Sequence, residues 1–280
     1  MKPSRLALAL ALALAWSALS AAPAAGQTET VPPDADAAAA RLESSPRHGE
    51  WVWVKTGAGD SVSAWLVYPE RKEKAPVVVV IHEIFGLTDW IRGVADQLAA
   101  DGFIAIAPDL LSGKGPGGGG TGSLDRDGVV RAVRALERDE VVTRLRAVAR
   151  YATALPAATD RYATIGYCWG GSTSFHFATA DAELDAAVVY YGSSPDTERL
   201  GAVRAPVLGL YGGDDARVNA TIEPAAREME RLGKTYEVEI YEGAGHGFLR
   251  AQAGRDGANA RATEQAWPRT LRFLRSQLGG

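Results

Sequence analysis

The segment Tyr162-Ala-Thr-Ile-Gly-Tyr-Cys-Trp-Gly-Gly171 places a short apolar strand directly before a glycine-flanked turn and a helical pattern at residues 172–180. The turn has the form G-x-nucleophile-x-G. A sharp strand-to-helix turn of this form lifts its central side chain above the sheet edge, and only small neighbours fit around it. The partial positive charge of a helix N-terminus favours a thiolate there. The segment therefore predicts that Cys168 is a nucleophile, although a buried structural cysteine beside a glycine turn would show the same letters.

Apolar runs and helical patterns alternate on both sides of this segment. Residues 51–54 and 61–68 alternate in character around a glycine-containing turn and predict an antiparallel hairpin. Further strands are expected at residues 76–81, 103–107, 187–191, 207–211 and 236–241, and helices at 89–100, 125–154, 220–232 and 260–278. This order predicts an α/β fold with a mostly parallel central sheet, helices on both faces and an antiparallel N-terminal hairpin. Binding sites in such sheets lie at the carboxyl ends of the strands.

Composition excludes several classes of protein. The net charge of −4, without a run of lysines and arginines, argues against a nucleic-acid partner. The single cysteine excludes a disulfide framework and a cysteine-rich zinc site. His82-Glu83 does not extend to the metal-binding pattern H-E-x-x-H, because residue 86 is glycine. We expect no metal and no organic cofactor.

The N-terminus has the pattern of a secretory signal peptide. Lys2 and Arg5 precede a run of alanine and leucine, and small residues follow. We expect a signal peptide over residues 1–26, a linker or short helix over 27–50 and a single domain over 51–280, with an uncleaved anchor as the alternative. No later apolar run is long enough to span a membrane, so we expect a periplasmic or secreted protein without stable membrane association after cleavage.

A base and an acid should follow the nucleophile along the chain. His246 lies in a glycine-flanked loop after the last strand, and Asp214 and Asp215 follow the strand at 207–211. The order nucleophile, acid, histidine is that of α/β-hydrolases, and on this evidence either aspartate could orient the imidazole. We expect a surface position for His48, a packing role for His176 and a place near the site for His82. The glycine-dense stretch 113–122 is expected to be a surface loop.

Glu83 ends the strand at 76–81 and opens the segment Glu83-Ile-Phe-Gly86. In α/β-hydrolases this position supplies the second donor to a developing oxyanion, so the backbone N–H groups of Ile84 and Trp169 are the expected oxyanion hole. A carboxylate at the site mouth is costly without a partner, and either the Cys168 thiol or an arginine could serve. The alternative is a solvated glutamate at the end of a strand.

Five motifs together resemble the dienelactone hydrolase family over residues 51–278: His82-Glu-Ile-Phe-Gly-Leu87, Ala107-Pro-Asp-Leu110, Gly166-Tyr-Cys-Trp-Gly-Gly171, Gly212-Gly-Asp-Asp215 and Gly245-His-Gly-Phe248. The resemblance implies a catalytic triad of Cys168, Asp215 and His246. It favours Asp215 over Asp214, because the family's acid stands three residues before a valine, here Val218. It also implies that Glu83 holds the resting thiol until substrate binds.

The resemblance further implies that arginines bind a substrate carboxylate. Arg250 matches one of them, and the second falls in residues 124–134, where this sequence departs from the family pattern and Arg131 is a weak candidate. The predicted function is hydrolysis of a small ester or lactone through a Cys168 acyl-enzyme, resembling a carboxymethylenebutenolidase. Two alternatives stay open: a non-catalytic binding protein on the same fold, or an acyltransferase or peptidase that uses the same residues.

Overall fold

The computed structural model describes residues 31–57 and 59–279, so the signal-peptide prediction for residues 1–26 lies outside the described residues. Within them, eight strands form one sheet in the order β1-β2-β4-β3-β5-β6-β7-β8. The strands are β1 (Gly49–Gly57), β2 (Asp60–Val67), β3 (Ala75–Ile81), β4 (Ile104–Pro108), β5 (Ala158–Tyr167), β6 (Ala186–Tyr190), β7 (Val207–Gly212) and β8 (Tyr236–Tyr241). β1 and β2 pair antiparallel with each other, β2 pairs antiparallel with β4, and the remaining neighbours pair parallel. The predicted fold class and hairpin are confirmed.

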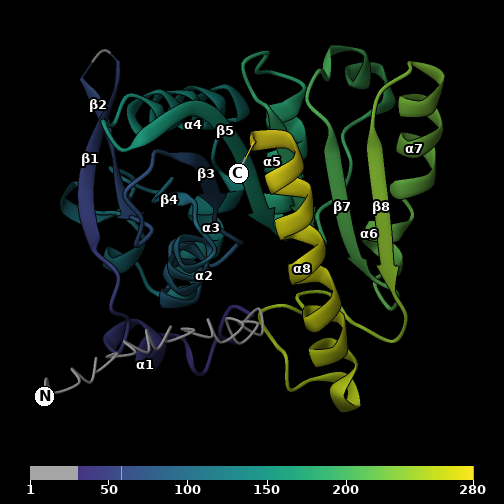
Figure 1. The fold of residues 1–280 in the computed structure, drawn as a ribbon, viewed down its shortest axis with the longest axis horizontal. Helices are drawn as coiled ribbons and strands as arrows, with labels where there is room; N and C mark the ends of the chain where they lie inside the picture. Colours follow the sequence, from purple (N-terminus) through teal and green to yellow (C-terminus); the bar gives the residue numbers. More distant parts are fainter. Residues whose placement is uncertain (1–30, 58, 280) are drawn as a thin grey trace, which may run out of the picture. The chain divides into compact units, whose positions relative to one another are not determined.

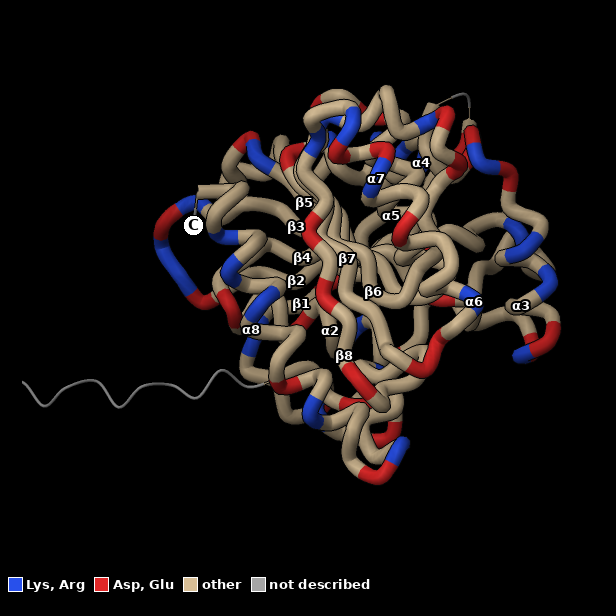
Figure 2. Tube along the Cα trace, turned by 90° about the vertical axis from the view of Figure 1, so that its right-hand side faces the viewer, with Lys and Arg blue, Asp and Glu red and all other residues tan. Residues whose placement is uncertain are grey.

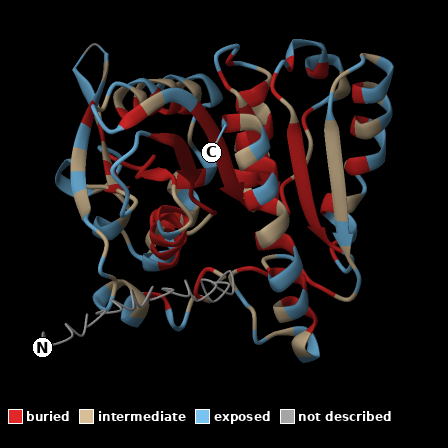
Figure 3. Ribbon diagram, in the orientation of Figure 1, coloured by how far each residue is buried: buried red, intermediate tan, exposed pale blue. Residues whose placement is uncertain are grey.

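The middle of the sheet is apolar on both faces, as its sequence requires. Every residue of β3 is buried, and its run of valines suits a strand covered by helices on two sides. Val78 and Val80 face one core cluster, while Val77 and Val79 face the other. β3, β4, β6 and β7 are buried along their length, whereas β8 at the edge is mostly half-buried (Figure 3).

Two layers of helices cover the sheet (Figure 1). One core cluster joins the sheet to α2 (Asp89–Ala100) and α8 (Ala258–Leu278), and the other joins it to α4 (Arg138–Thr153), α5 (Trp169–Ala178) and α7 (Ile222–Arg231). The shorter helices are α1 (Ala38–Glu43), which packs against α2; α3 (Arg126–Arg134); and α6 (Ala216–Asn219), which packs against α7. This is the three-layer arrangement that alternating strands and helices produce.

Residues 125–154, which were expected to be mostly helical, form two helices with a short break between them. α3 ends at Arg134 and α4 begins at Arg138, with Glu137 in an extended conformation (ψ 137°). The interruption lets Leu136 pack between the α3 cluster and the core beneath α4. The helix expected over residues 220–232 is likewise preceded by the separate turn α6.

The segment before the hairpin packs against the domain. The Trp90 indole N–H donates to the carbonyl of Pro33 (3.0 Å), and Arg47 pairs with the buried Asp96 (2.5 Å). The backbone N–H of Ala35 donates to the carbonyl of Arg250 (3.0 Å). The range expected to be a linker or short helix thus contains α1 and supports the loop that carries Arg250.

Both signs of charge are spread over the loops and helices (Figure 2), in keeping with the small net charge of −4. Within the part of the chain that the structure describes, no helix is long and apolar enough to cross a membrane.

The chain reverses its winding direction at the centre of the sheet. From β3 it passes through α2 to β4 on one side, and from β4 it returns through α3 and α4 to β5 on the other. A crevice for ligands forms where neighbouring strands lead to opposite sides. Arrowheads of β5, β7 and β8 end at the same lower edge in Figure 1, and the candidate residues follow these ends.

Candidate active site

Cys168 occupies a strained turn between β5 and α5. Its backbone angles are φ 55° and ψ −114°, a region that residues with a side chain rarely adopt. A Cβ at Gly166 would lie 1.9 Å from the carbonyl oxygen of Gly170, and a Cβ at Gly170 would lie 2.3 Å from that of Ile81. The two glycines are therefore obligatory, as the motif predicted, and the half-buried Cys168 lies at the N-terminus of a ten-residue helix.

His246 lies between Cys168 and Asp215. Its Nδ1 is 2.5 Å from Oδ2 of Asp215, so Nδ1 carries the hydrogen and donates it. The other oxygen of this buried carboxylate accepts the N–H of Val218 (3.5 Å), because Asp215 caps α6. The Cys168 side chain faces the same imidazole and is the largest influence on its pKa. Cysteine, imidazole and carboxylate thus form a chain of contacts in the predicted order.

Cys168 raises the pKa of His246 to about 9. The hydrogen bond with the Cys168 side chain is the largest cause, burial opposes it, and the Cys168 charge and the carboxylate of Asp215 add to it. The protonated imidazole is therefore favoured beside the Cys168 side chain at neutral pH. Such a pair can attack a carbonyl carbon and then supply a proton to the leaving group.

Asp214, the competing acid, lies apart from His246. Its Oδ2 pairs with Arg255 at 2.8 Å, and both side chains are about half exposed. Of the two adjacent carboxylates, only Asp215 contacts the imidazole.

Glu83 is buried beside Arg250. Arg250 Nε is 2.8 Å from Oε1 of Glu83, whose side chain is 4% exposed. Burial raises the pKa of Glu83 to about 7, although the positive charges of Arg250 and His246 lower it. Among the described residues neither Arg250 Nε nor Glu83 Oε1 has a partner in hydrogen-bond geometry, so the pair is held by charge. An arginine, one of the two partners expected for Glu83, is thus beside it.

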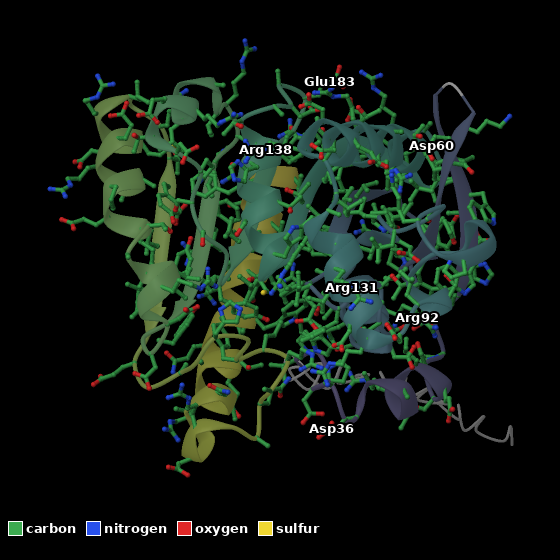
Figure 4. The ribbon with its side chains drawn as sticks, turned by 180° about the vertical axis from the view of Figure 1, so that it is seen from behind. Asp36, Asp60, Arg92, Arg131, Arg138 and Glu183 are labelled. Atoms are coloured by element: carbon green, nitrogen blue, oxygen red, sulfur yellow. The ribbon has the colours of Figure 1, made fainter. Side chains whose placement is uncertain are left out.

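Two guanidinium groups lie on the ring of Phe85. Arg250 and Arg126 have their Cζ atoms 5.1 and 4.9 Å from the ring centroid, at cation–π distance. Arg126 begins α3 and is exposed, and within the described residues no carboxylate forms an ion pair with it. Arg131, the weak candidate from sequence, lies further along α3 on its exposed side (Figure 4). Arg126 lies in the range 124–134 that was expected to hold a second arginine.

Tyr191 is a site residue that sequence reasoning missed. It follows β6 with φ 39°, is fully buried, and its ring contacts that of His246 edge-on with centroids 5.3 Å apart. Burial raises its pKa well above the usual range, with further contributions from the charges of Glu83 and Cys168. Its position just after a parallel strand was the available signal.

The glycine-dense stretch is tied to the segment at Glu83. Asp109 accepts the backbone N–H of Thr121 (2.7 Å) and its hydroxyl (2.7 Å). The Thr121 hydroxyl oxygen also accepts the N–H of Leu87 (3.1 Å). The predicted surface loop therefore has one fixed point, which supports the turn that carries Ile84.

Within the described residues, the other histidines make no direct contact with the side chains of Cys168, His246 or Asp215. His48 is exposed near Glu50. His176 borders a cavity of about 460 Å³ between α4 and α5, and burial lowers its pKa to about 4. Over residues 31–57 and 59–279, no group of three or more histidines, cysteines, aspartates and glutamates could hold a metal ion.

Comparisons with known proteins find one matching family model and several similar proteins. The family model described as "Dienelactone hydrolase family" matches residues 62–278. The carboxymethylenebutenolidase of Pseudomonas putida is 32% identical over 233 residues, which cover 80% of this chain and 95% of that protein. A candidate dienelactone hydrolase from Klebsiella pneumoniae is similar in structure, with a TM-score of 0.72, 26% identity and coverage of 81% of this chain and 98% of the other. The dienelactone hydrolase-like promiscuous phosphotriesterase P91 from metagenomic libraries has a TM-score of 0.69 at 25% identity, covering 82% and 98%.

Proposed function

The chain belongs to the dienelactone hydrolase family of carboxylic ester hydrolases, and from that premise we propose that it cleaves a small carboxylate-bearing ester or lactone through a covalent Cys168 acyl-enzyme. The observation that carries the proposal is the chain of contacts from Cys168 through His246 to Asp215 at the ends of three strands.

The reaction has two halves. The Cys168 thiolate attacks the substrate carbonyl carbon, and the N–H groups of Ile84 and Trp169 stabilise the oxyanion that forms. When the ester C–O bond breaks, the leaving oxygen takes a proton from His246 and a thioester remains on Cys168. His246 then removes a proton from water, the hydroxide attacks the thioester, and the carboxylate product and the Cys168–His246 pair are regenerated.

Arg250 and Arg126 are the proposed anion site. They lie on the same ring of Phe85, and Arg250 is about one-third exposed, so a substrate carboxylate can reach it. A bound carboxylate would compete with Glu83 for Arg250. We propose that Glu83 gates the nucleophile in this way, because its separation from Arg250 leaves a carboxylate beside His246 that favours the protonated imidazole.

Replacing Arg250 with methionine should separate anionic from neutral substrates. Loss of a charge-assisted contact worth about 1.5–3 kcal/mol predicts that KM for a carboxylated ester rises roughly 10- to 100-fold. KM for the uncharged amide analogue of that ester should change less than about threefold. Steady-state kinetics on both substrates test this, with Arg227→Met on the exposed face of α7 as the matched control. Equal effects on both substrates would contradict the anion site, and no turnover of any ester or lactone by the wild type would contradict the proposed function.

The pKa of Glu83 predicts how anionic substrates bind as pH changes. Because burial raises that pKa to about 7, Glu83 is protonated below pH 7 and ionised above it. Only the ionised form competes for Arg250, so KM for a carboxylated ester should rise up to about tenfold from pH 6 to pH 8. KM for a neutral ester should stay flat over this range. Glu83→Gln cannot titrate and should remove the slope, whereas an unchanged slope in that variant would assign the titration to another group.

We further propose that the enzyme acts outside the cytoplasm, in the periplasm or beyond. The proposal rests on the charged start and the alanine- and leucine-rich run of residues 1–26. N-terminal sequencing of the protein recovered from the periplasm tests it: an end near Gly26 is expected, and an intact Met1 contradicts it.

A further inference from the structure

His82 contacts Trp169 and the carbonyl of Glu83, which belongs to the peptide that carries the N–H of Ile84. It follows β3 directly and is fully buried. Its Nδ1 is 2.8 Å from the carbonyl oxygen of Glu83, and since a carbonyl only accepts, Nδ1 carries the hydrogen. Its ring stacks on the indole of Trp169, with centroids 5.5 Å apart and planes 17° from parallel.

The hydrogen bond at the Glu83 carbonyl controls the neighbouring N–H. The carbonyl of Glu83 and the N–H of Ile84 belong to one planar peptide unit, so fixing the direction of the C=O fixes the direction of the N–H. This carbonyl also accepts the N–H of Gly86 (3.1 Å). Two donors hold this carbonyl, and they polarise the peptide so that its N–H becomes a stronger donor.

The imidazole is suited to a fixed structural contact. Burial lowers the pKa of His82, and the largest opposing contribution is its hydrogen bond to the Glu83 carbonyl. The ring is therefore neutral with its hydrogen on Nδ1. Within the described part of the chain its Nε2 has no hydrogen-bond partner, so Nδ1–H is the one hydrogen bond that holds the ring.

We propose that His82 is a positioning residue of the oxyanion hole, because its Nδ1–H orients the peptide whose N–H is that of Ile84 and its ring holds Trp169 in place. The inference deepens the proposed function and rests on it. His82 itself does not contact the reacting atoms, and it acts through the two backbone donors.

Two substitutions of His82 distinguish the effect of its hydrogen bond from the effect of its packing. His82→Leu removes the donor and keeps an apolar side chain of similar size, whereas His82→Asn places an amide N–H close to the position of Nδ1. Three measurements are needed on each variant. They are kcat and KM for an aryl ester, the inhibition constant of an aryl trifluoromethyl ketone, and the rate at which 2,2′-dipyridyl disulfide modifies Cys168. The ketone forms an oxyanion on attack by the thiolate, whereas the disulfide reaction needs the thiolate alone.

In His82→Leu we expect kcat and ketone affinity to fall together by roughly 10- to 100-fold, less than or comparable to the loss of a whole oxyanion donor. KM and the disulfide rate should stay within about twofold, since the thiolate–imidazolium pair is untouched. His82→Asn should recover most of the loss. Should His82→Leu fail to fold, His82→Gln, whose amide is displaced by one methylene, gives the same comparison with His82→Asn.

An active wild type with unchanged kcat and ketone affinity in His82→Leu overturns the inference alone. A disulfide rate that falls in step with kcat also overturns it, because His82 would then act on the thiol. A wild type that neither hydrolyses esters nor binds the ketone overturns the proposed function, and the inference with it.

Discussion

Cys168→Ala should lower kcat/KM for a small aryl ester or lactone by about 10⁴- to 10⁶-fold, close to the uncatalysed rate. The sulfur is the atom that forms the acyl-enzyme, and no other group at the turn can replace it. The large effect follows because the remaining members of such a site contribute little when the nucleophile is absent. Progress curves at high enzyme concentration measure the residual activity.

The Cys168→Ala variant should keep the structure of the turn. Alanine keeps the Cβ and the backbone angles φ 55° and ψ −114° of residue 168, so the strained conformation and the glycine contacts around it are unchanged. Thermal unfolding should therefore be similar to that of the wild type, and Ser276→Ala on the exposed end of α8 should be fully active. If Cys168→Ala hydrolyses the ester as fast as the wild type, covalent catalysis at this residue is wrong.

Asp215→Asn should lower kcat/KM by about 10³- to 10⁴-fold, which is near the effect of the same change in a serine protease. The carboxylate accepts the hydrogen on His246 Nδ1 at 2.5 Å, so Nε2 is the nitrogen that exchanges a proton with Cys168. An amide can instead donate to Nδ1, which moves the hydrogen to Nε2 and removes the base from the thiol. The Asp215 carboxylate also raises the pKa of His246, so the alkaline limb of the pH–rate profile should move to lower pH.

Asp214→Asn is the matched control for that change. Asp214 is the adjacent residue, carries the same charge and pairs with Arg255 at the surface, so its amide variant should keep kcat/KM within about twofold. A larger loss in Asp214→Asn than in Asp215→Asn would reverse the assignment of the acid.

The local sequence pattern was sufficient to predict the fold and the candidate residues that follow the strands. The uninterrupted valines of β3 require burial on two faces, and the turn at Cys168 requires glycine at 166 and 170 because a Cβ would overlap backbone. Both constraints leave a mark in the local sequence, a run of valines in β3 and two glycines around Cys168. This is why the parallel sheet, the turn and the chain order of Cys168, Asp215 and His246 can be predicted without coordinates.

Contacts between distant segments could not be predicted in this way. Arg126 and Arg250 are far apart in the chain and meet only because α3 and the last loop both reach Phe85. The break between α3 and α4 depends on the tertiary packing of Leu136, because the local sequence around it favours a continuing helix. His82 was expected only to lie near the site, because its contacts with Glu83 and Trp169 join the ends of two adjacent strands.

Acid quenching of the wild type during turnover of an aryl acetate, followed by peptide mass spectrometry, tests the central claim most directly. We expect one acetyl group on the peptide that contains Cys168, together with a burst of about one phenol released per enzyme molecule when hydrolysis of the thioester is the slower half. Steady turnover with the acetyl group on another residue, or with Cys168 alkylated and activity intact, would contradict it.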